Sequence, residues 1–195
     1  MSIIALTGKK QSGKDVMASY FVKRGFIHYK FADPIKELCS NVFLWDDDWV
    51  NGQYKETVDP RWGISPREAQ QLIGTELFRQ YLPVKSEGFR IKTEKNIWVN
   101  RFRYWYQNLF LTDMFPNVVI SDLRFLNEAE VVREMGGSIV RIDRPSITIN
   151  DSHASETEME EIIPDYTIIN NSSIATYEGK IREFVDAYIK ITDAL

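Results

Sequence analysis

The stretch "SIIALTGKKQSGKDVMASYF", residues 2–21, constrains the possible folds more than any other part of the chain. Its apolar first part predicts a short buried strand, and its last part has the apolar spacing of a helix. Between them, Gly8, four residues and Gly13-Lys14 nearly complete the phosphate-binding pattern G-x-x-x-x-G-K-[ST]. The glycines let the backbone approach a phosphate and the helix N-terminus favours an anion, while Lys14 is placed to reach the outer phosphates.

The last place of that pattern holds Asp15 instead of Ser or Thr. The difference removes the hydroxyl that normally contacts Mg²⁺ in such loops. A carboxylate offers the hard oxygen ligand that Mg²⁺ accepts, either directly or through a water molecule. We therefore expect Asp15 to preserve the affinity of the loop for the metal.

The rest of the chain alternates between strand-like and helix-like segments. Further strands are predicted at residues 26–34, 117–122, 138–145 and 166–171. Helices are predicted over 128–137, where Asn127 and Glu130 give a capping signal, and over 174–191. A mainly helical insertion is expected over about 37–115. This alternation predicts an α/β fold with a central parallel sheet of about five strands and helices on both faces.

Ligands of such sheets bind beyond the carboxyl ends of the strands. This rule selects the loop 8–15 and the charged residues that follow the other predicted strands, which are Asp33, Asp122, Arg124, Arg141 and Arg144. Arg124 comes two residues after Asp122, at the end of a strand. We expect Arg124 to clamp a phosphate, with a plain surface charge as the alternative.

The segment "SPREAQQLIGTELFRQYL", residues 65–82, predicts a helix with Ser65 as its cap and Pro66 in the first helical place. An apolar stripe is expected at Ala69, Leu72, Ile73 and Leu77. Arg67, Gln71, Gly74, Thr75 and Phe78 fall on another side at intervals of three and four. A mid-helix Gly74 costs about 1 kcal/mol, which suggests that another group approaches closely there. The alternative is an ordinary solvated helix face.

Composition excludes several classes of protein. The formal net charge of −4 argues against nucleic-acid binding without regard to sequence, which usually needs a basic face. No apolar run approaches the ~18 residues of a membrane span, and a secretory signal pattern is absent. The single Cys39 suits a reducing compartment. We expect one cytoplasmic domain over residues 1–195, with no membrane or nucleic-acid partner.

A phosphate-binding loop alone does not define a reaction. The sequence lacks the D-x-x-G and N-K-x-D motifs of GTPases, and it is short for a motor or helicase ATPase. Small-molecule kinases remain, because they combine such a loop with several Arg and Lys residues for a second anion. The acidic stretch 45–49 fits a solvated loop better than a metal site.

Six motifs, in this order and spacing, carry a resemblance to a known family. They are "GKKQSGKD", "FADPIKE", "SPREAQQLIGTELFR", "ISDLRFLNEAE", "RIDRP" and "DSHASE". Together they resemble the deoxynucleoside monophosphate kinases of tailed bacteriophages and other viruses, over residues 3–171. The resemblance implies a three-layer P-loop kinase fold that transfers the γ-phosphoryl of ATP to a dNMP with Mg²⁺, giving dNDP and ADP for DNA synthesis. A viral protein of this kind would act in the host cytoplasm.

The resemblance also implies roles for individual residues. ATP binding falls to Gly8, Gly13, Lys14, Asp15 and Val16, although Val16 replaces a Thr that the family often has. Binding of the dNMP falls to Lys10, Ile35, Lys36, Arg67, Gly74, Thr75, Asp122, Arg124 and Glu128. From their position near a strand end, Arg141 and Arg144, the latter at the start of a lid-like segment of about 144–157, are expected to close over the donor and act in catalysis with Lys14 and Arg124. Trp98, Tyr104 and Trp105 are candidates to stack on a base or to belong to the core.

Two other functions stay open on the sequence. Animal phosphomevalonate kinases share a similar G-K-x-x-S-G-K-D loop and a Ser-Glu element. The long 65–79 motif and "NEAE" favour the nucleotide reading. A non-catalytic nucleotide-binding sensor would keep Lys14 but would have no need of the acceptor arginines. The oligomeric state is left open, a homodimer included.

Overall fold

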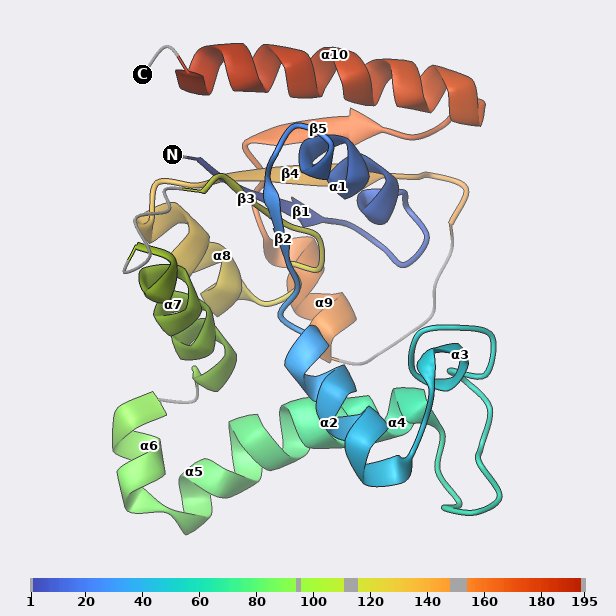
Figure 1. Cartoon of the computed structure of the whole chain (residues 1–195), viewed down its shortest axis with the longest axis vertical. Coiled ribbons are helices and arrows are strands. Elements are labelled where there is room, and N and C mark those ends of the chain that lie inside the picture. Colours follow the sequence, from blue (N-terminus) through green and yellow to red (C-terminus); the bar gives the residue numbers. More distant parts are fainter. Residues whose placement is uncertain (1, 94–95, 111–115, 148–153, 194–195) are drawn as a thin grey trace. The chain divides into compact units, whose positions relative to one another are not determined.

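The computed structural model describes residues 2–93, 96–110, 116–147 and 154–193 (Figure 1). The chain divides into two compact units. Residues 1–30 and 105–195 form the sheet unit, and residues 31–104 form the helical unit. The helical unit overlaps the insertion predicted at about 37–115, but it begins at residue 31, and residues 105–110 belong to the sheet unit. Part of the predicted lid, residues 148–153, and part of the "DSHASE" motif, residues 151–153, lie outside the described residues.

The sheet unit is built on five strands in the order β2-β3-β1-β4-β5. Their bounds are Ile3–Thr7 (β1), Ile27–Tyr29 (β2), Val118–Ile120 (β3), Ser138–Asp143 (β4) and Tyr166–Ile169 (β5). Every pairing is parallel, with Ile4 opposite Val119 and Leu6 opposite Val140. The predicted parallel sheet is therefore confirmed, and all five carboxyl ends lie at one edge.

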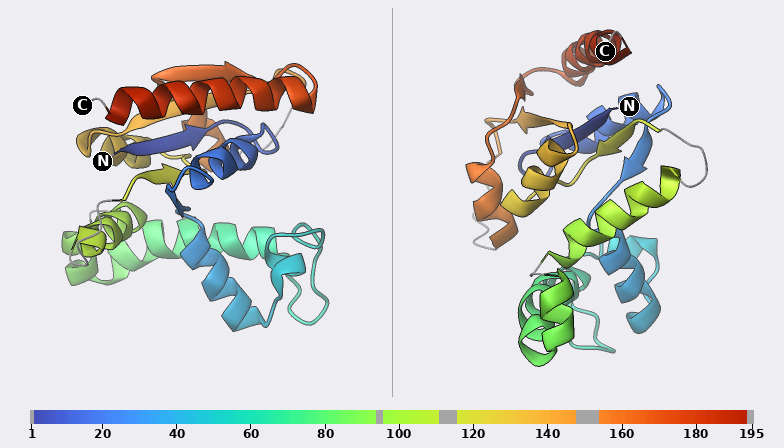
Figure 2. Two further views of the ribbon diagram at one scale, coloured as in Figure 1. Left: turned by 45° about the horizontal axis from the view of Figure 1, so that its top comes forward. Right: turned by 90° about the vertical axis from the view of Figure 1, so that its left-hand side faces the viewer.

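Helices cover both faces of this sheet (Figures 1 and 2). Helices α1 (Lys14–Val22) and α10 (Ile174–Asp193) lie on one face, and α8 (Leu126–Glu134) and α9 (Ala154–Glu161) lie on the other. Alternate residues of β1, Ile4 and Leu6, pack with Met17 and Phe21 of α1 and Ile181 of α10 in one buried cluster. This packing fixes α1, and the loop that leads into it, against the sheet.

The helical unit contains a run of short helices. They are α2 (Asp33–Phe43), α3 (Asp47–Val50), α4 (Pro66–Gln71), the π-helical η1 (Leu72–Tyr81), α5 (Leu82–Lys85) and α6 (Glu87–Thr93), followed by α7 (Ile97–Phe110), which continues into the sheet unit. Cys39, Trp45, Val50 and Ala69 form a buried cluster within this unit. None of the described helices is long and apolar enough to cross a membrane.

Two predicted boundaries are wrong. Strand β2 ends at Tyr29, and Asp33-Pro34 opens α2 instead of closing the strand. The reason is that proline fixes a φ suited to the first helical turn and has no N–H to leave unbonded. The cap of α8 is provided by Glu128, whose carboxylate accepts from the N–H of Arg124 at 3.0 Å and of Phe125 at 3.1 Å, and not by Asn127 with Glu130.

The predicted helix at 65–82 is confirmed at its start and different further on. The Ser65 hydroxyl accepts from the N–H of Glu68 at 3.2 Å, as the capping pattern requires. From Leu72 the chain is π-helical, so its hydrogen bonds run over five residues and the faces no longer follow a period of 3.6. Leu72 and Leu77, expected in the apolar stripe, are 45% and 37% exposed, whereas Gly74 and Thr75 are buried.

Candidate active site

The loop between β1 and α1 has a backbone that only glycine accommodates at two places. Gly8 and Gly13 have φ values of +136° and +110°, in the left-handed region. A Cβ on Gly8 would lie 2.3 Å from the carbonyl oxygen of Ile142 in β4. A Cβ on Gly13 would lie 2.7 Å from the ring of Tyr177 in α10. The two glycines therefore let the loop press against β4 on one side and α10 on the other.

Lys14, the first residue of α1, folds back over this loop. Its side chain is largely buried, and its ammonium group donates to the carbonyl oxygens of Gly8 at 2.5 Å and Lys9 at 2.7 Å. Gly13 occupies the N-cap position and makes no side-chain cap to the first turn of α1. The loop thus joins a helix N-terminus, where partial positive charge gathers, to a lysine ammonium. Such an arrangement suits a phosphate.

Asp15, in the first turn of α1, pairs with Lys30, which directly follows β2. The Lys30 ammonium donates to the Asp15 carboxylate at 2.9 Å. Partial burial opposes ionisation, but the hydrogen bond from Lys30 and the charges of Lys30, Lys14 and His28 outweigh it, so the pKa of the Asp15 carboxyl lies below its ordinary value. The side chain stays 77% exposed, so this ion pair adds little to stability and remains accessible to a ligand.

Backbone N–H groups help to fix the turn after β3. The Leu123 N–H donates to the Leu6 carbonyl at 3.2 Å, which joins the turn to β1. Glu128 is buried and receives the backbone N–H of Arg124, so this carboxylate holds the turn that carries Asp122 and Arg124. Asp122 and Arg124 are themselves half-buried at the carboxyl edge of the sheet.

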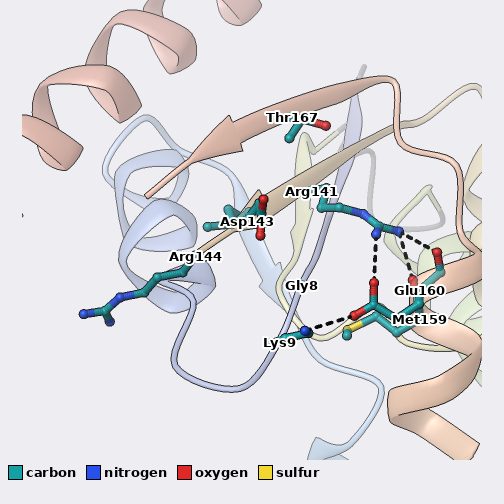
Figure 3. Close-up of a pocket in the computed structure, with 9 residues that line it drawn as sticks. Gly8, Lys9, Arg141, Asp143, Arg144, Met159, Glu160 and Thr167 are labelled. Carbon is teal, nitrogen blue, oxygen red and sulfur yellow. Dashed lines mark hydrogen bonds and ion pairs between the residues drawn. The ribbon is translucent and has the colours of Figure 1, made fainter. Parts of the chain in front are cut away.

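Arg141 lies within β4 and Arg144 directly follows it, but the two side chains have different surroundings. Arg141 lines a pocket of about 180 Å³ beside Gly8 and Lys9 (Figure 3). Its guanidinium donates to the carbonyls of Met159 and Ile162 at 3.0 and 2.5 Å and to the Glu160 carboxylate at 3.3 Å, which ties β4 to α9. Arg144 extends away from that group, and its Nη1 donates to the Gln11 carbonyl of the phosphate loop at 3.1 Å.

Gly74, one of the acceptor candidates of the helical unit, lies in close contact with other residues of that unit. A Cβ on Gly74 would lie 2.8 Å from Cδ1 of Ile35, and the Trp98 indole N–H donates to the Gly74 carbonyl at 2.9 Å. The expected close approach to Gly74 is confirmed, and Ile35 and Trp98 make it. Trp98 is therefore a core residue of this unit.

The charged candidates of the helical unit are paired with carboxylates. Arg67 lies 3.7 Å from Glu56, and Lys36 lies 3.5 Å from Asp33. Thr75, beside Gly74, is buried. These contacts hold each cation in place and do not by themselves identify a ligand.

The structure brings Gly8, Gly13, Lys14 and Asp15 together in one loop, with Lys10 half-buried and Val16 39% exposed beside them. Three residues that the sequence analysis did not select also contact this loop or the start of α1, namely Lys30, Asn170 and Tyr177. Lys30 and Asn170 each follow a strand directly, so the strand-end rule would have found them. Tyr177 lies within the apolar pattern of α10 and gives no separate signal.

The donor set for a metal is small. Among the described residues there is no group of three or more His, Cys, Asp or Glu side chains able to hold an ion. Mg²⁺ typically needs only one or two carboxylates when phosphates and water supply the other oxygens. The accessible Asp15 carboxylate at the start of α1 fits that requirement.

The amino-acid sequence of this chain is similar to that of known kinases. The family model for deoxynucleotide monophosphate kinase matches residues 89–181. A provisionally named deoxynucleotide monophosphate kinase of Acanthamoeba polyphaga mimivirus is 42% identical over 191 residues, covering 95% of this chain and 97% of that protein. The deoxynucleotide monophosphate kinase of Enterobacteria phage T4 is 22% identical, covering 83% of this chain and 64% of its own length.

A solved structure supports the fold. Dephospho-CoA kinase from Campylobacter jejuni superposes with a TM-score of 0.51 at 16% identity, covering 97% of this chain and 98% of that one. At this level of identity the likeness concerns the three-layer P-loop kinase fold alone. With the viral relative aligned over almost its whole length, the chain belongs to the deoxynucleotide monophosphate kinase family.

Proposed function

We propose that this protein transfers the γ-phosphoryl group of ATP to the phosphate of a deoxynucleoside monophosphate, giving dNDP and ADP. The observation that carries the proposal is the phosphate loop closed by Gly8 and Gly13, with Lys14 folded over it. The loop occurs in a chain 42% identical to a viral relative named for this activity.

The donor side of the proposal rests on the loop and the start of α1. Backbone N–H groups of the loop, among them those of Gly13 and Lys14, would bind the β- and γ-phosphates of ATP, assisted by the dipole of α1. Lys14 would exchange its contacts with the Gly8 and Lys9 carbonyls for contacts with phosphate oxygens, since an anion attracts the ammonium more strongly than a neutral carbonyl does. Val16 would contribute only through its backbone.

Asp15 would hold Mg²⁺ through its carboxylate, either directly or through water. The ion would supply positive charge that offsets the charge developing on the phosphate oxygens. Asp15 is ionised at neutral pH because its pKa lies below the ordinary value. Lys30 would then release the carboxylate or share it with the ion.

Roles toward the acceptor are proposed for residues of each unit by itself. In the sheet unit these are Lys10, Asp122, Arg124 and Glu128, and in the helical unit they are Ile35, Lys36, Arg67, Gly74 and Thr75. Arg124 and Arg67 would bind the phosphate of the dNMP, because a guanidinium matches two phosphate oxygens at once. Glu128 would act by fixing the turn that presents Arg124, since its carboxylate already accepts that residue's N–H.

Arg141 and Arg144 are proposed to act on the donor side as a lid closes. Arg144 already contacts the phosphate loop through Gln11, which supports a role near ATP. Arg141 would have to exchange some of its contacts with α9 to reach a phosphate, or would act by holding β4 to α9.

Positioning and charge compensation would provide most of the catalysis. The transferred phosphoryl group spreads its charge over three oxygens, and Lys14 with the loop N–H groups would stabilise that charge. A general base is unnecessary, because the attacking oxygen of the dNMP phosphate is already anionic.

A coupled ADP-release assay with product detection tests the proposal. The substrates are ATP with each of the four dNMPs, the four NMPs and phosphomevalonate. We expect ADP and the matching dNDP with at least one dNMP. Turnover with phosphomevalonate alone would make the protein a phosphomevalonate kinase, and ATP binding without turnover on any acceptor would make it a nucleotide sensor.

A further inference from the structure

Two residues outside the recognised motifs donate hydrogen bonds to backbone carbonyls of the phosphate loop. Asn170 follows β5 directly and is 9% exposed. Its side-chain amide donates to the Ser12 carbonyl at 2.8 Å, across 158 residues of sequence. Its own N–H donates to the Asp143 carbonyl at 2.7 Å, so the residue is fixed to the end of β4. Asn170 therefore connects the carboxyl end of the sheet to the loop.

Tyr177, near the start of α10, makes the neighbouring contact. It is 4% exposed, and its hydroxyl donates to the Gly13 carbonyl at 3.1 Å, across 164 residues of sequence. Its ring occupies the space where a Cβ of residue 13 would lie. Burial raises the pKa of the Tyr177 hydroxyl, so it stays protonated and remains a donor at physiological pH.

These two contacts fix the direction of two consecutive peptide groups. In a trans peptide the C=O and the following N–H point in opposite directions. When Asn170 holds the Ser12 carbonyl on its own side, the Gly13 N–H is turned to the other side. The Gly13 carbonyl accepts from the Met17 N–H of α1 and from the Tyr177 hydroxyl, each at 3.1 Å, so Tyr177 adds a second restraint on the peptide that carries the Lys14 N–H.

We propose that Asn170 and Tyr177 are positioning residues for the donor site. They orient the 12–13 and 13–14 peptides so that the N–H groups of Gly13 and Lys14 face the phosphates of ATP before the nucleotide binds. This inference rests on the proposed function. The expected energetic benefit is preorganisation. N–H donors that are already aligned do not have to reorient when the ATP phosphates bind.

A comparison of tyrosines within one helix tests this role. Tyr177→Phe removes the hydroxyl at the loop and keeps the ring that packs on Gly13. Tyr188→Phe is the matched control, since Tyr188 is also buried in α10 and its hydroxyl bonds Ser2 and the Ile3 carbonyl at the other end of β1. Asn170→Ala removes the second contact. The readouts are the dissociation constant for ATP, the KM for dNMP, the midpoint of thermal unfolding, and hydrogen exchange of residues 8–16 without nucleotide.

We expect Tyr177→Phe to weaken ATP binding roughly 3- to 10-fold, the loss of one hydrogen bond, and Asn170→Ala to weaken it roughly 10-fold or more, because the buried Ser12 carbonyl loses its donor. Both should speed exchange in residues 8–16 and leave the KM for dNMP within about twofold, whereas Tyr188→Phe should change only thermal stability.

Equal ATP affinity and equal loop exchange in Tyr177→Phe and Tyr188→Phe, in an active wild-type protein, would overturn the inference. If Asn170→Ala does not fold, the two tyrosine variants still decide the matter. A wild-type protein that neither binds ATP nor forms dNDP would instead contradict the proposed function.

Discussion

The sheet unit and the helical unit present their candidate ligand groups by different means. In the sheet unit the loop 8–14 offers backbone groups, held by steric fit against Ile142 and Tyr177. In the helical unit the candidates are long cationic side chains, such as Arg67 beside Glu56. A backbone loop is fixed by the fold around it, whereas a cationic side chain such as Arg67, 20% exposed beside the 55% exposed Glu56, can exchange its carboxylate for a ligand.

The two units also differ in what makes them rigid. The loop of the sheet unit packs against backbone and a buried ring, which cannot yield easily. The helical unit combines its buried apolar cluster with a buried polar group, Asp59, which accepts hydrogen bonds from Arg61 and from the Trp45 indole, each at 2.7 Å. The hydrogen bond from Arg61 outweighs desolvation and, with that from Trp45, holds the pKa of the Asp59 carboxyl far below its usual range.

This difference suggests a division of labour under the proposed function. Changes in the loop of the sheet unit should affect every turnover, because all acceptors share the donor. Changes to the cations of the helical unit should affect use of the acceptor more than binding of ATP. Substitutions in each unit therefore test whether the loop acts on the donor and the cations of the helical unit act on the acceptor.

The largest effect is expected for Lys14→Ala. Loss of the ammonium should lower kcat by about 10³-fold, because Lys14 places its positive charge over the loop, against the Gly8 and Lys9 carbonyls. Thermal unfolding should change little, since Lys14 contacts loop carbonyls and does not fill the core. Steady-state kinetics with circular dichroism measures both. Near-normal turnover in the folded variant would remove the loop as the donor site.

Gly8→Ala should have the next largest effect. The added Cβ would meet the backbone oxygen of Ile142 at 2.3 Å, and a non-glycine residue is strained at this φ, so we expect a loss of roughly 3 kcal/mol in the free energy of unfolding. Gly136→Ala is the control, because Gly136 also has a positive φ but has open space around it. Denaturant titrations that give the two variants equal stability would contradict the steric account of the loop.

A smaller and more selective effect is expected for the proposed acceptor arginines. Arg67→Ala and Arg124→Ala should each lower kcat/KM for the dNMP roughly 10- to 100-fold and leave the affinity for ATP nearly unchanged. Arg67→Lys should stay impaired, because an ammonium cannot reproduce the planar guanidinium. Kinetics with the dNMP as varied substrate tests this. Normal dNMP kinetics with reduced ATP affinity would move these residues to the donor side or the scaffold.

The smallest effect should be that of Asp15→Ala on the metal. We expect the Mg²⁺ concentration for half-maximal activity to rise roughly 10-fold, while Lys30→Ala, which frees the Asp15 carboxylate, should leave it unchanged or lower it. The pKa of Asp15 is lowered in the fold, so any stability from its ion pair is complete above the ordinary carboxyl pKa and is lost only as pH falls through the lowered one. An unchanged Mg²⁺ titration would contradict a role for Asp15 in metal binding and leave only its ion pair with Lys30 at the start of α1.

Much of the sheet unit could be predicted because its signals are local. The strand, the glycine spacing and the helix of residues 2–21 stand next to one another in sequence, and the remaining strands are apolar runs. The end of β2 was misjudged because Asp33-Pro34 is compatible with both a turn and a helix start. The π-helix from Leu72 to Tyr81 differs from the predicted α-helix because the apolar pattern was compared with a period of 3.6 residues per turn.

The strand-end rule would have selected Asn170 as a candidate, but the contacts that support the loop could not be predicted, because they join residues far apart in sequence. Asn170 and Tyr177 reach Ser12 and Gly13 only after β5 and α10 have packed beside β4 and α1. An Asn after a strand and a Tyr in an apolar helix are common, and neither specifies a contact before the fold is known. Side-chain pairing, unlike glycine spacing, depends on tertiary packing.

The central claim is that the loop carries the donor and that its terminal phosphoryl group moves to a dNMP. Phosphorus NMR of a reaction containing ATP, Mg²⁺ and a dNMP that supports ADP release follows that group directly. We predict that the γ-phosphate signal of ATP decays as the β-phosphate signal of dNDP appears in equal amount, and that Lys14→Ala abolishes both changes. Release of inorganic phosphate without dNDP, or dNDP formed at the wild-type rate by Lys14→Ala, would contradict the account.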